Sequence, residues 1–453
     1  MASCVTVQLG QCGTQIGHEL LDILYEDACQ TSTTLTTKTN NEYKDTSLKT
    51  FFHETGSGYE ARSVMVDMEP KAVNCALSGT SGKGWSYAKR QQFCQKSGSG
   101  NNWAYGFKVH APRCKDGILD CIRREVEKCD YFSGFLILMS LAGGTGSGVG
   151  SYITGLLREE YPHATLINPV VCPYTAGEVA VQNYNAILSL SNMCATTDAN
   201  ILLHNNHLHE VCQKLLGLKH VTFTDMNSVA ASQLASLLQP ISASTSSMDM
   251  FSQQQRDVLS EIVLQLACNG QYKLLDIKSV PHIPVGSVAY STFEWEALVK
   301  RIYQMHITDY YMDEGLNWKA RLPATGLEEK CAKYPSKYLS TLLIMRGLEA
   351  SSFDPNLSRK FTDSRLYANW MPEYYRCAVW KTDKPFQKYE KSLTIVSNGT
   401  PCIKPLNMTV EKAWDMFGAR AYLHQYTKYG LEETDFINAF VAVENLISVY
   451  KKL

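Results

Sequence analysis

The segment FSGFLILMSLAGGTGSGVGSYITGLLREEYP, residues 132–162, decides the fold class of this chain. It runs from an apolar stretch into five glycines within the eight positions 143–150, and then into a helical pattern. A strand, a glycine-rich loop and a helix in this order can bind phosphate, because backbone amides and a helix N-terminus attract an anion. We therefore expect a buried strand at 132–142, followed by a loop that binds a phosphorylated ligand.

The glycine loop matches neither of the two common nucleotide-binding fingerprints. A P-loop has the pattern GxxxxGK[ST], and no lysine follows these glycines at that spacing. The dinucleotide pattern GxGxxG also fails, because Gly144, Gly146, Gly148 and Gly150 recur at every second position. The sequence thus argues against both a P-loop enzyme and a dinucleotide-dependent oxidoreductase.

Composition and charge narrow the class of protein further. The 453 residues are 45% hydrophobic and 19% charged, which is typical of globular proteins. The net charge is -1 and no basic stripe alternates with aromatic residues, so we expect no nucleic-acid partner. The 15 cysteines form no CxxC pair, and no run approaches about 18 apolar residues. We expect an intracellular protein with free thiols and no membrane partner.

Strand-like and helical segments alternate over the first 200 residues or so. The strand-like segments lie at 3–9, 62–70, 132–142 and 165–173. Their alternation with helices predicts an α/β fold with an open, mostly parallel, Rossmann-like sheet that binds its ligand at the carboxyl edge. Segment 30–50 is polar and rich in threonine, so we expect a surface loop there.

The second half of the sequence has a different pattern. Residues 224–240 read as one long amphipathic helix that is capped by Thr224 and lies between domains. We expect a linker at 242–253 and a mixed α+β region at 272–400.

Two helices are expected at the end of the chain, packed as a hairpin. The first should end at Gly430, and Thr434 should cap the second. The apolar residues expected on one face of that second helix are Phe436, Ile437, Phe440 and Leu446.

Four short stretches, in order, resemble the signature of the tubulin family. They are GQCGTQIG at 10–17, VDMEP at 66–70, SGSGNNWAYG at 97–106 and AGGTGSG at 142–148. The resemblance covers nearly the whole chain. It implies the tubulin fold, with a GTP-binding domain at 1–205, a core helix and intermediate domain at 206–407, and a C-terminal helical hairpin at 408–453.

Within the family, the sequence resembles the delta-tubulin subfamily. FCQKSGSGNNWAYG at 93–106 and HQYTKYGLEETDF at 424–436 have the character of that subfamily, and PHIPVGSVAY at 281–290 is shorter than the lateral-contact loop of microtubule-forming tubulins. The chain ends in SVYKKL, where alpha- and beta-tubulin have an acidic tail. Epsilon-tubulin and a divergent alpha/beta-like isoform are the alternatives.

The resemblance assigns residues to the phosphates and to magnesium. Ser140, Gly143, Gly144, Thr145 and Gly146 surround the β- and γ-phosphates of GTP or GDP, and Gly98, Gly100 and Asn101 sense the γ-phosphate. Gly10, Gln11 and Cys12 form the first turn, from which Gln11 reaches phosphate or Mg²⁺. Cys12 and Gln15 line the nucleotide, although Cys12 is equally consistent with an inert buried thiol. Asp67 and Glu69 are the expected Mg²⁺ ligands, with a solvated turn as the alternative.

The resemblance also assigns the sugar and base contacts. Glu178 lies in the loop that touches the ribose in tubulins, and Gln182 replaces a glutamate of the family there. Asn205 and Asn227 are placed to recognise guanine, since an amide both donates and accepts hydrogen bonds. Phe223 is placed to stack on the base.

The expected catalytic acid belongs to a different subunit from the nucleotide it acts on. In tubulins an acid of the next subunit orients the attacking water, and Glu261 falls at that position. The helix that carries Glu261 also presents Gln254, Asp257 and Gln265, opposite Val258, Ile262 and Leu266. A purely solvated helix face is the alternative reading of Asp257 and Glu261.

The function implied by the resemblance is that of a guanine-nucleotide-binding cytoskeletal subunit of centrioles and basal bodies. It would support triplet microtubules, with epsilon-tubulin, alpha/beta-tubulin and centriolar proteins as partners. An assembling GTPase and a non-hydrolysing, GTP-stabilised adaptor that binds or sequesters other tubulins both remain open.

Overall fold

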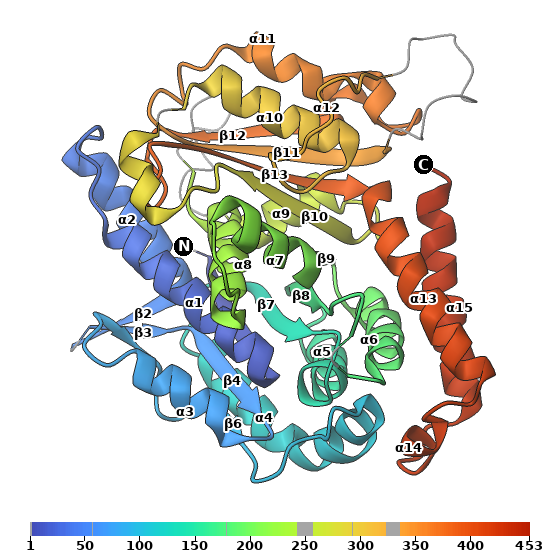
Figure 1. The fold of residues 1–453 in the computed structure, drawn as a ribbon. Coiled ribbons are helices and arrows are strands. Elements are labelled where there is room, and N and C mark those ends of the chain that lie inside the picture. The colour runs from blue at the N-terminus through green and yellow to red at the C-terminus, as the bar shows by residue number, and fades with distance from the viewer. Residues whose placement is uncertain (1, 57, 178, 242–256, 292, 323–335) are drawn as a thin grey trace.

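A single ten-stranded sheet runs through the molecule (Figure 1). The computed structural model describes residues 2–56, 58–177, 179–241, 257–291, 293–322 and 336–453. The strand order is β12-β11-β13-β10-β9-β8-β7-β1-β4-β6. In chain order these strands are β1 Ser3–Leu9, β4 Ser63–Asp67, β6 Gln92–Cys94, β7 Phe132–Ser140, β8 Thr165–Cys172, β9 Ala199–His204, β10 Leu274–Val280, β11 Tyr338–Gly347, β12 Cys377–Thr382 and β13 Lys391–Gly399.

The sheet is mostly parallel, as predicted. All pairings from β6 through to β10 are parallel, and antiparallel pairing begins where β13 lies between β10 and β11. The four strands predicted from the first 200 residues are all present. A separate three-stranded sheet is formed by β2 Phe52–Thr55, β3 Gly58–Ala61 and β5 Trp85–Ser86.

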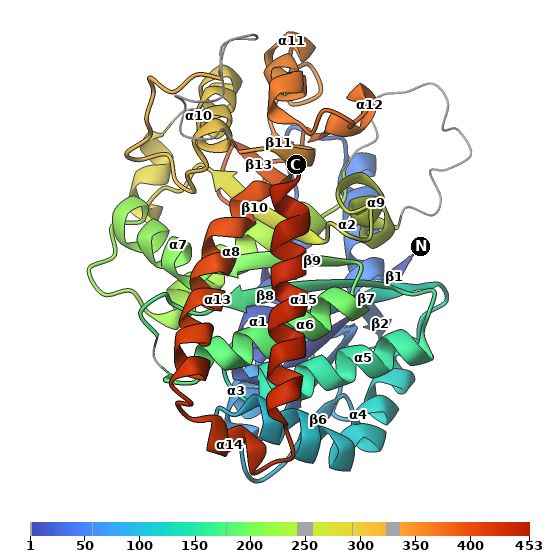
Figure 2. The ribbon, with the colours of Figure 1, turned by 90° about the vertical axis from the view of Figure 1, so that its right-hand side faces the viewer.

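Helices cover both faces of the sheet, and each face has its own apolar core. On one face lie α1 Gly10–Cys29, α2 Thr37–Phe51, α3 Pro70–Gly79, α8 Phe223–Leu238 and α9 Val258–Leu266. On the other lie α4 Ala111–Val126, α5 Gly150–Glu160, α6 Gln182–Thr196, α13 Ile403–Gly418 and α15 Glu433–Lys451. Figure 2 shows α13 and α15 side by side over α6. This arrangement confirms the predicted α/β class.

The mixed region expected at 272–400 is present. Its helix α10 Trp295–Thr308 packs on β10 and β13. Short helical turns accompany it: η4 Val285–Tyr290, α11 Pro355–Ser358 and α12 Glu373–Arg376. The linker expected at 242–253 lies outside the described residues.

The prediction of a surface loop at 30–50 was wrong, because most of this segment forms α2. The Thr36 hydroxyl caps this helix by accepting from the Thr39 amide at 3.2 Å. Its few large apolar side chains, Tyr43, Leu48 and Phe51, all fall on the buried side. Tertiary contacts therefore stabilise this helix, which the polar composition of the segment does not predict.

Helix α8 is the long helix predicted near 224–240, but its cap differs from the prediction. Thr222, rather than Thr224, forms a capping box with Asp225. At the other end, the buried guanidinium of Arg346 from β11 donates to the carbonyls of Ser236, Gln239 and Pro240. A cation at a helix C-terminus satisfies carbonyls that lack helical partners and complements the helix dipole.

The C-terminal hairpin also differs from the sequence prediction in detail. Its first helix, α13, ends at Gly418, and a separate short helix, α14 Leu423–Thr427, precedes Gly430. Glu432 rather than Thr434 caps α15, in a capping box with Asp435. Ile437 is exposed, because the buried face of α15 is formed by Phe436, Ala439, Phe440, Val443, Ile447 and Tyr450.

We expect Arg346→Met to destabilise the protein by about 3 kcal/mol, because several buried carbonyls would lose a charged donor. Thermal and urea denaturation would measure the loss. The control is Arg124→Met, which removes an exposed guanidinium from α4 and should leave stability nearly unchanged. Equal stability of the two variants would contradict the role given to Arg346.

Candidate nucleotide site

Four loops meet at the carboxyl edge of the sheet, and glycines permit their contacts. A Cβ atom at Gly10 would lie 2.7 Å from the amide nitrogen of Gly146. One at Gly144 would lie 2.6 Å from Cβ of Ser99. The first βα turn, the loop after β7 and the segment 98–102 are therefore packed backbone against backbone. These are three of the four stretches on which the sequence resemblance rested.

The loop after β7 leads directly into a helical segment. Gly143 has a φ of +85°, which favours glycine, and a π-helical turn, η2 Thr145–Val149, continues into α5. The Ser147 hydroxyl donates to the Gly143 carbonyl, and the Ser140 hydroxyl donates to the Ala142 carbonyl at 2.7 Å. The start of this segment can attract an anion through its amides and dipole, without a lysine.

The segment 98–102 lies directly against the glycine loop. Gly100 and Asn101 have φ values of 56° and 51°, so the backbone turns sharply there. The Ser99 hydroxyl is 3.3 Å from that of Thr145 and 2.9 Å from Nδ1 of His110. Asn101 and Gly143 are also neighbours, since a Cβ atom at Gly143 would lie 3.7 Å from Asn101 Oδ1. These contacts place Gly100 and Asn101 beside the glycine loop, where the prediction put them.

The expected magnesium ligands occupy the end of β4. The Asp67 side chain is buried, accepts from the Met68 amide at 2.8 Å, and lies near the Thr145 hydroxyl. Burial is the main cause that raises the pKa of Asp67 to about 6. Glu69 is exposed and lies against Gly98. No group of three or more possible metal-ligating residues occurs among the described residues.

This pair fits Mg²⁺ held together with nucleotide phosphates. Magnesium usually binds proteins through one or two carboxylates, with waters and substrate phosphates completing its shell. A cation would also offset the cost of ionising the buried Asp67.

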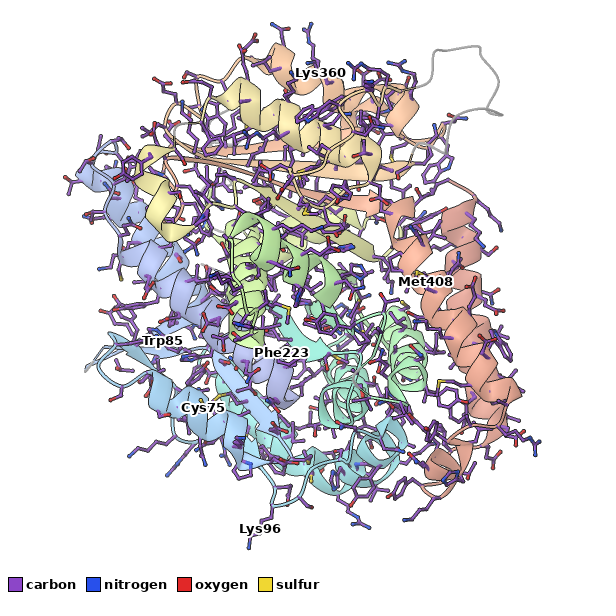
Figure 3. The ribbon with its side chains drawn as sticks, viewed as in Figure 1. Cys75, Trp85, Lys96, Phe223, Lys360 and Met408 are labelled. Atoms are coloured by element: carbon purple, nitrogen blue, oxygen red, sulfur yellow. The ribbon has the colours of Figure 1, made fainter. Side chains whose placement is uncertain are left out.

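The residues expected around the base lie at the starts of helices or on facing helices. Asn227 on α8 donates to Gln15 Oε1 on α1 at 3.4 Å, so these two side chains are brought together. Phe223 begins α8 and is 50% exposed, so its ring is accessible from solvent (Figure 3). Asn205 begins α7 Asn205–Glu210, directly after β9.

The expected ribose loop is only partly described, because Glu178 lies outside the described residues. Gln182 is buried and donates to the Tyr174 carbonyl at 2.8 Å. In this chain the Gln182 side chain therefore holds the loop that precedes Glu178.

Two further residues expected at the nucleotide lie in the first turn, directly after β1. Gln11 is exposed beside Gly10, and Cys12 is half-buried on α1. Burial raises the pKa of the Cys12 thiol to about 12, so it stays protonated at neutral pH. Cys12 can contact a nucleotide as a neutral group, but it is not an activated nucleophile.

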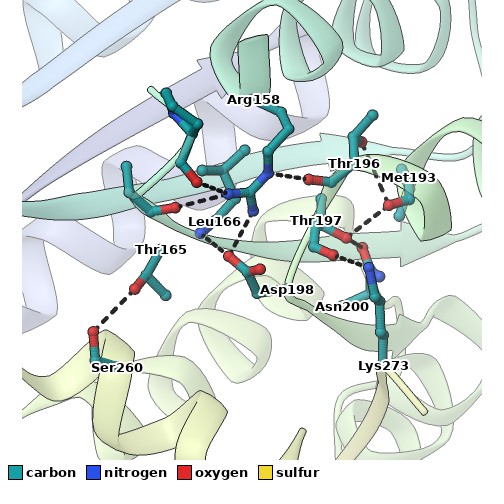
Figure 4. A network of polar contacts seen from close by, with 12 residues as sticks. Arg158, Thr165, Leu166, Met193, Thr196, Thr197, Asp198, Asn200, Ser260 and Lys273 are labelled. Atoms are coloured by element: carbon teal, nitrogen blue, oxygen red, sulfur yellow. Dashed lines mark hydrogen bonds and ion pairs between the residues drawn. The ribbon is translucent and has the colours of Figure 1, made fainter. Parts of the chain in front are cut away.

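Glu261 lies at the opposite edge of the sheet from the glycine loop. Asp257 caps α9, and its carboxylate also accepts from Ser133 near the start of β7. Ser260 is 3.0 Å from Thr165 at the start of β8, within the polar contacts drawn in Figure 4. Since β7 runs from this edge to Ser140, α9 is roughly 20 Å from the glycine loop.

The rest of α9 partly matches the predicted pattern. Ile262 and Leu266 are buried as expected, whereas Val258 is only half-buried. Asp257 is a helix cap rather than part of a solvated face. Gln254 lies outside the described residues.

Sequence reasoning gave no role to two buried residues beside this site, Asn185 and Tyr426. Asn185 bonds to the segment that carries Asn101, and Tyr426 bonds to Asn185. Asn185 is one of three asparagines in α6, so the sequence of this helix did not single it out.

The comparisons with known proteins identify the family of this chain. Residues 3–213 match the model of the Tubulin/FtsZ family, GTPase domain. The chain is 44% identical to the tubulin delta chain of Macaca fascicularis and 42% identical to that of Homo sapiens, over 100% of each chain. It is 26% identical to the tubulin beta-3 chain of Oomycete-like sp. (strain MacKay2000), over 100% of this chain and 95% of that one.

The fold and the matched domain thus define a GTPase-domain protein of the Tubulin/FtsZ type. The full-length identities show that the chain belongs to the tubulin family. It is more similar to these delta chains than to the beta-3 chain, which confirms the resemblance to the delta subfamily. In the described part of the chain, no helix is both long and apolar enough to cross a membrane.

We expect magnesium to strengthen GTP binding more at pH 7 than at pH 5. The raised pKa of Asp67, about 6, means that the carboxyl is neutral below this pH and can hold a cation only above it. Titrations of GTP with and without Mg²⁺ across this range would show the effect. Asp67→Asn should reduce the pH dependence to the part that comes from the terminal phosphate of GTP, which itself titrates at about pH 6, and the exposed-site control Asp415→Asn should retain the full dependence. The same pH dependence in Asp67→Asn as in the unmodified protein would refute the role of Asp67.

We expect Cys12 to react slowly with maleimide at neutral pH, even after the nucleotide is removed. Its raised pKa leaves little thiolate, whereas Cys75 (Figure 3) and Cys268 are exposed and should be modified first. Peptide mapping after timed labelling would rank the three thiols. Labelling of Cys12 as fast as that of Cys75 would show that the thiol is activated.

Proposed function

We propose that this tubulin binds GTP or GDP with Mg²⁺ at the carboxyl edge of its sheet. The main support is the packing of the loops at 10–12, 98–102 and 142–148 against one another. Asp67 and Glu69 provide the metal ligands, Gln15, Asn205 and Asn227 surround the base, and Phe223 stacks on it. Ser140, Gly143, Gly144, Thr145 and Gly146 surround the phosphates.

We propose further that GTP hydrolysis is completed by Glu261 of a neighbouring subunit. Glu261 is carried on α9 at the amino edge, so it cannot reach the nucleotide of its own chain. In a head-to-tail stack, the amino edge of one subunit would face the carboxyl edge of the next. An acid at that junction can orient the attacking water, and positioning of this kind, together with electrostatic stabilisation, is what proteins contribute to this chemistry.

The cellular role that we propose follows from the similarity to tubulin delta chains. The protein would act in the cytoplasm and cytoskeleton, at centrioles and basal bodies, and would support triplet microtubules. Its partners would be epsilon-tubulin, alpha/beta-tubulin and centriolar proteins. The alternative is an adaptor stabilised by GTP, and it predicts that the bound GTP is not hydrolysed.

We expect phosphate release to rise faster than linearly with protein concentration, and Glu261→Ala to slow it by roughly 100-fold. The variant should still bind GTP, because Glu261 lies away from its own nucleotide. Glu159→Ala, which removes an exposed acid from the end of α5, is the matched control and should hydrolyse GTP normally.

Three outcomes distinguish the proposals. Loss of hydrolysis with retained binding in the Glu261 variant supports catalysis by a neighbour. Intact bound GTP at every concentration of the unmodified protein supports the adaptor. Absence of any bound guanine nucleotide contradicts both.

A further inference from the structure

A buried polar network joins the segment 101–103 to the C-terminal hairpin. Its centre is Asn185 on α6, which is fully buried. Asn185 Oδ1 accepts from the Trp103 amide at 3.0 Å and from the Tyr426 hydroxyl at 2.6 Å. Asn185 Nδ2 donates to the carbonyl of Asn101 at 2.9 Å. The Tyr426 hydroxyl of α14 is therefore one side chain away from the backbone of Asn101.

A second connection runs parallel to the first. Asn102 Nδ2 donates to the carbonyl of Gln425 on α14 at 3.1 Å, and Asn102 Oδ1 accepts from the Tyr105 amide at 3.0 Å. The rings of Tyr105 and Tyr429 are 4.6 Å apart. Figures 1 and 2 both place α14 at the end of the hairpin near this part of the chain. The segment 101–105 is thus held by Asn185 of α6 at its backbone, and by Gln425 of α14 and by Tyr429 at its side chains.

Tyr426 itself has little freedom to move. Its ring is fully buried and packs edge-on against Tyr184 and Phe436. The Tyr184 hydroxyl in turn donates to the carbonyl of Ala421, just before α14, at 3.1 Å. A shift of α14 would therefore be transmitted to Asn185 and the Asn101 backbone, because buried polar partners cannot be replaced by water without cost.

We infer that Tyr426 is a positioning residue for the γ-phosphate loop, acting through Asn185 to fix Asn101 and Gly100 in the conformation that receives GTP. The inference rests on the proposed nucleotide site. It names the Tyr426–Asn185 contact as one source of that site's selectivity for GTP over GDP. Linkage makes the coupling reciprocal: if α14 favours the GTP conformation of the loop, then GTP orders α14 more than GDP does.

The chain offers a close control for a substitution at Tyr426. Tyr450 is also a fully buried tyrosine of the same hairpin, and its hydroxyl donates to an asparagine, Asn398 Oδ1, at 2.9 Å. The Tyr450 hydroxyl also accepts from the Leu274 amide at 2.8 Å. Tyr450 lies at the end of α15 that is far from α14. Tyr450→Phe therefore removes a comparable buried hydroxyl away from the phosphate loops.

The test is to measure GTP and GDP affinities of the unmodified protein, Tyr426→Phe and Tyr450→Phe. We expect Tyr426→Phe to lower the GTP-to-GDP affinity ratio about fivefold, the effect of one hydrogen bond, while GDP affinity stays within about twofold. Tyr450→Phe should lower thermal stability by a similar amount and leave the ratio unchanged. An unchanged ratio in Tyr426→Phe, or an equal change in both variants, would overturn the inference.

Hydrogen–deuterium exchange of the unmodified protein provides a second test that needs no variant. Amides at 101–105 and 423–427 should exchange more slowly with GTP than with GDP, whereas amides in the middle of α13 should not respond. Protection at 101–105 without any change in α14 would also overturn the inference. If neither nucleotide binds to the unmodified protein, the proposed function fails, and this outcome is distinct from a failure of the coupling alone.

Discussion

The candidate site depends on close backbone packing between the segment 99–107 and the turn 144–149. A Cβ atom at Gly106 would lie 2.2 Å from the carbonyl oxygen of Gly144, and one at Gly148 would lie 2.4 Å from that of Trp103. Only glycine allows two backbones to approach so closely. This contact brings the amides after β7 next to Asn101, and the other loops of the site are arranged around it.

The proposed function divides the site between the two edges of the sheet. The loops proposed to hold the phosphates and the metal lie at its carboxyl edge, whereas Glu261 lies at its amino edge, beyond the Ser260–Thr165 contact. A site divided in this way would be complete only when two subunits meet, so hydrolysis would depend on assembly. The C-terminal hairpin adds a second connection, because α14 contacts the segment proposed to sense the γ-phosphate through Asn185 and Asn102.

Much of this arrangement could be predicted from the sequence, because the glycine loops and apolar strands are local patterns. Helix α2 could not, because its stability comes from tertiary contacts such as the 2.6 Å bond from the Tyr43 hydroxyl to Asp27. The role of Tyr426 was also hidden, since it depends on a contact between residues 241 positions apart. The placement of Glu261 and the glycine loop at opposite edges could not be predicted either, because it depends on the strand directions of the whole sheet.

The most direct test of the central claim is the guanine nucleotide content of purified Gly144→Ala, compared with Gly155→Ala. At Gly144 a methyl group would meet Ser99 and the Asn102 amide, although the φ of -112° suits alanine, whereas nothing lies within 4 Å of a Cβ atom at Gly155. The account predicts that Gly144→Ala folds but loses its bound nucleotide, and that Gly155→Ala retains it. Nucleotide bound at the unmodified level in folded Gly144→Ala would contradict the claim that this backbone contact forms the site.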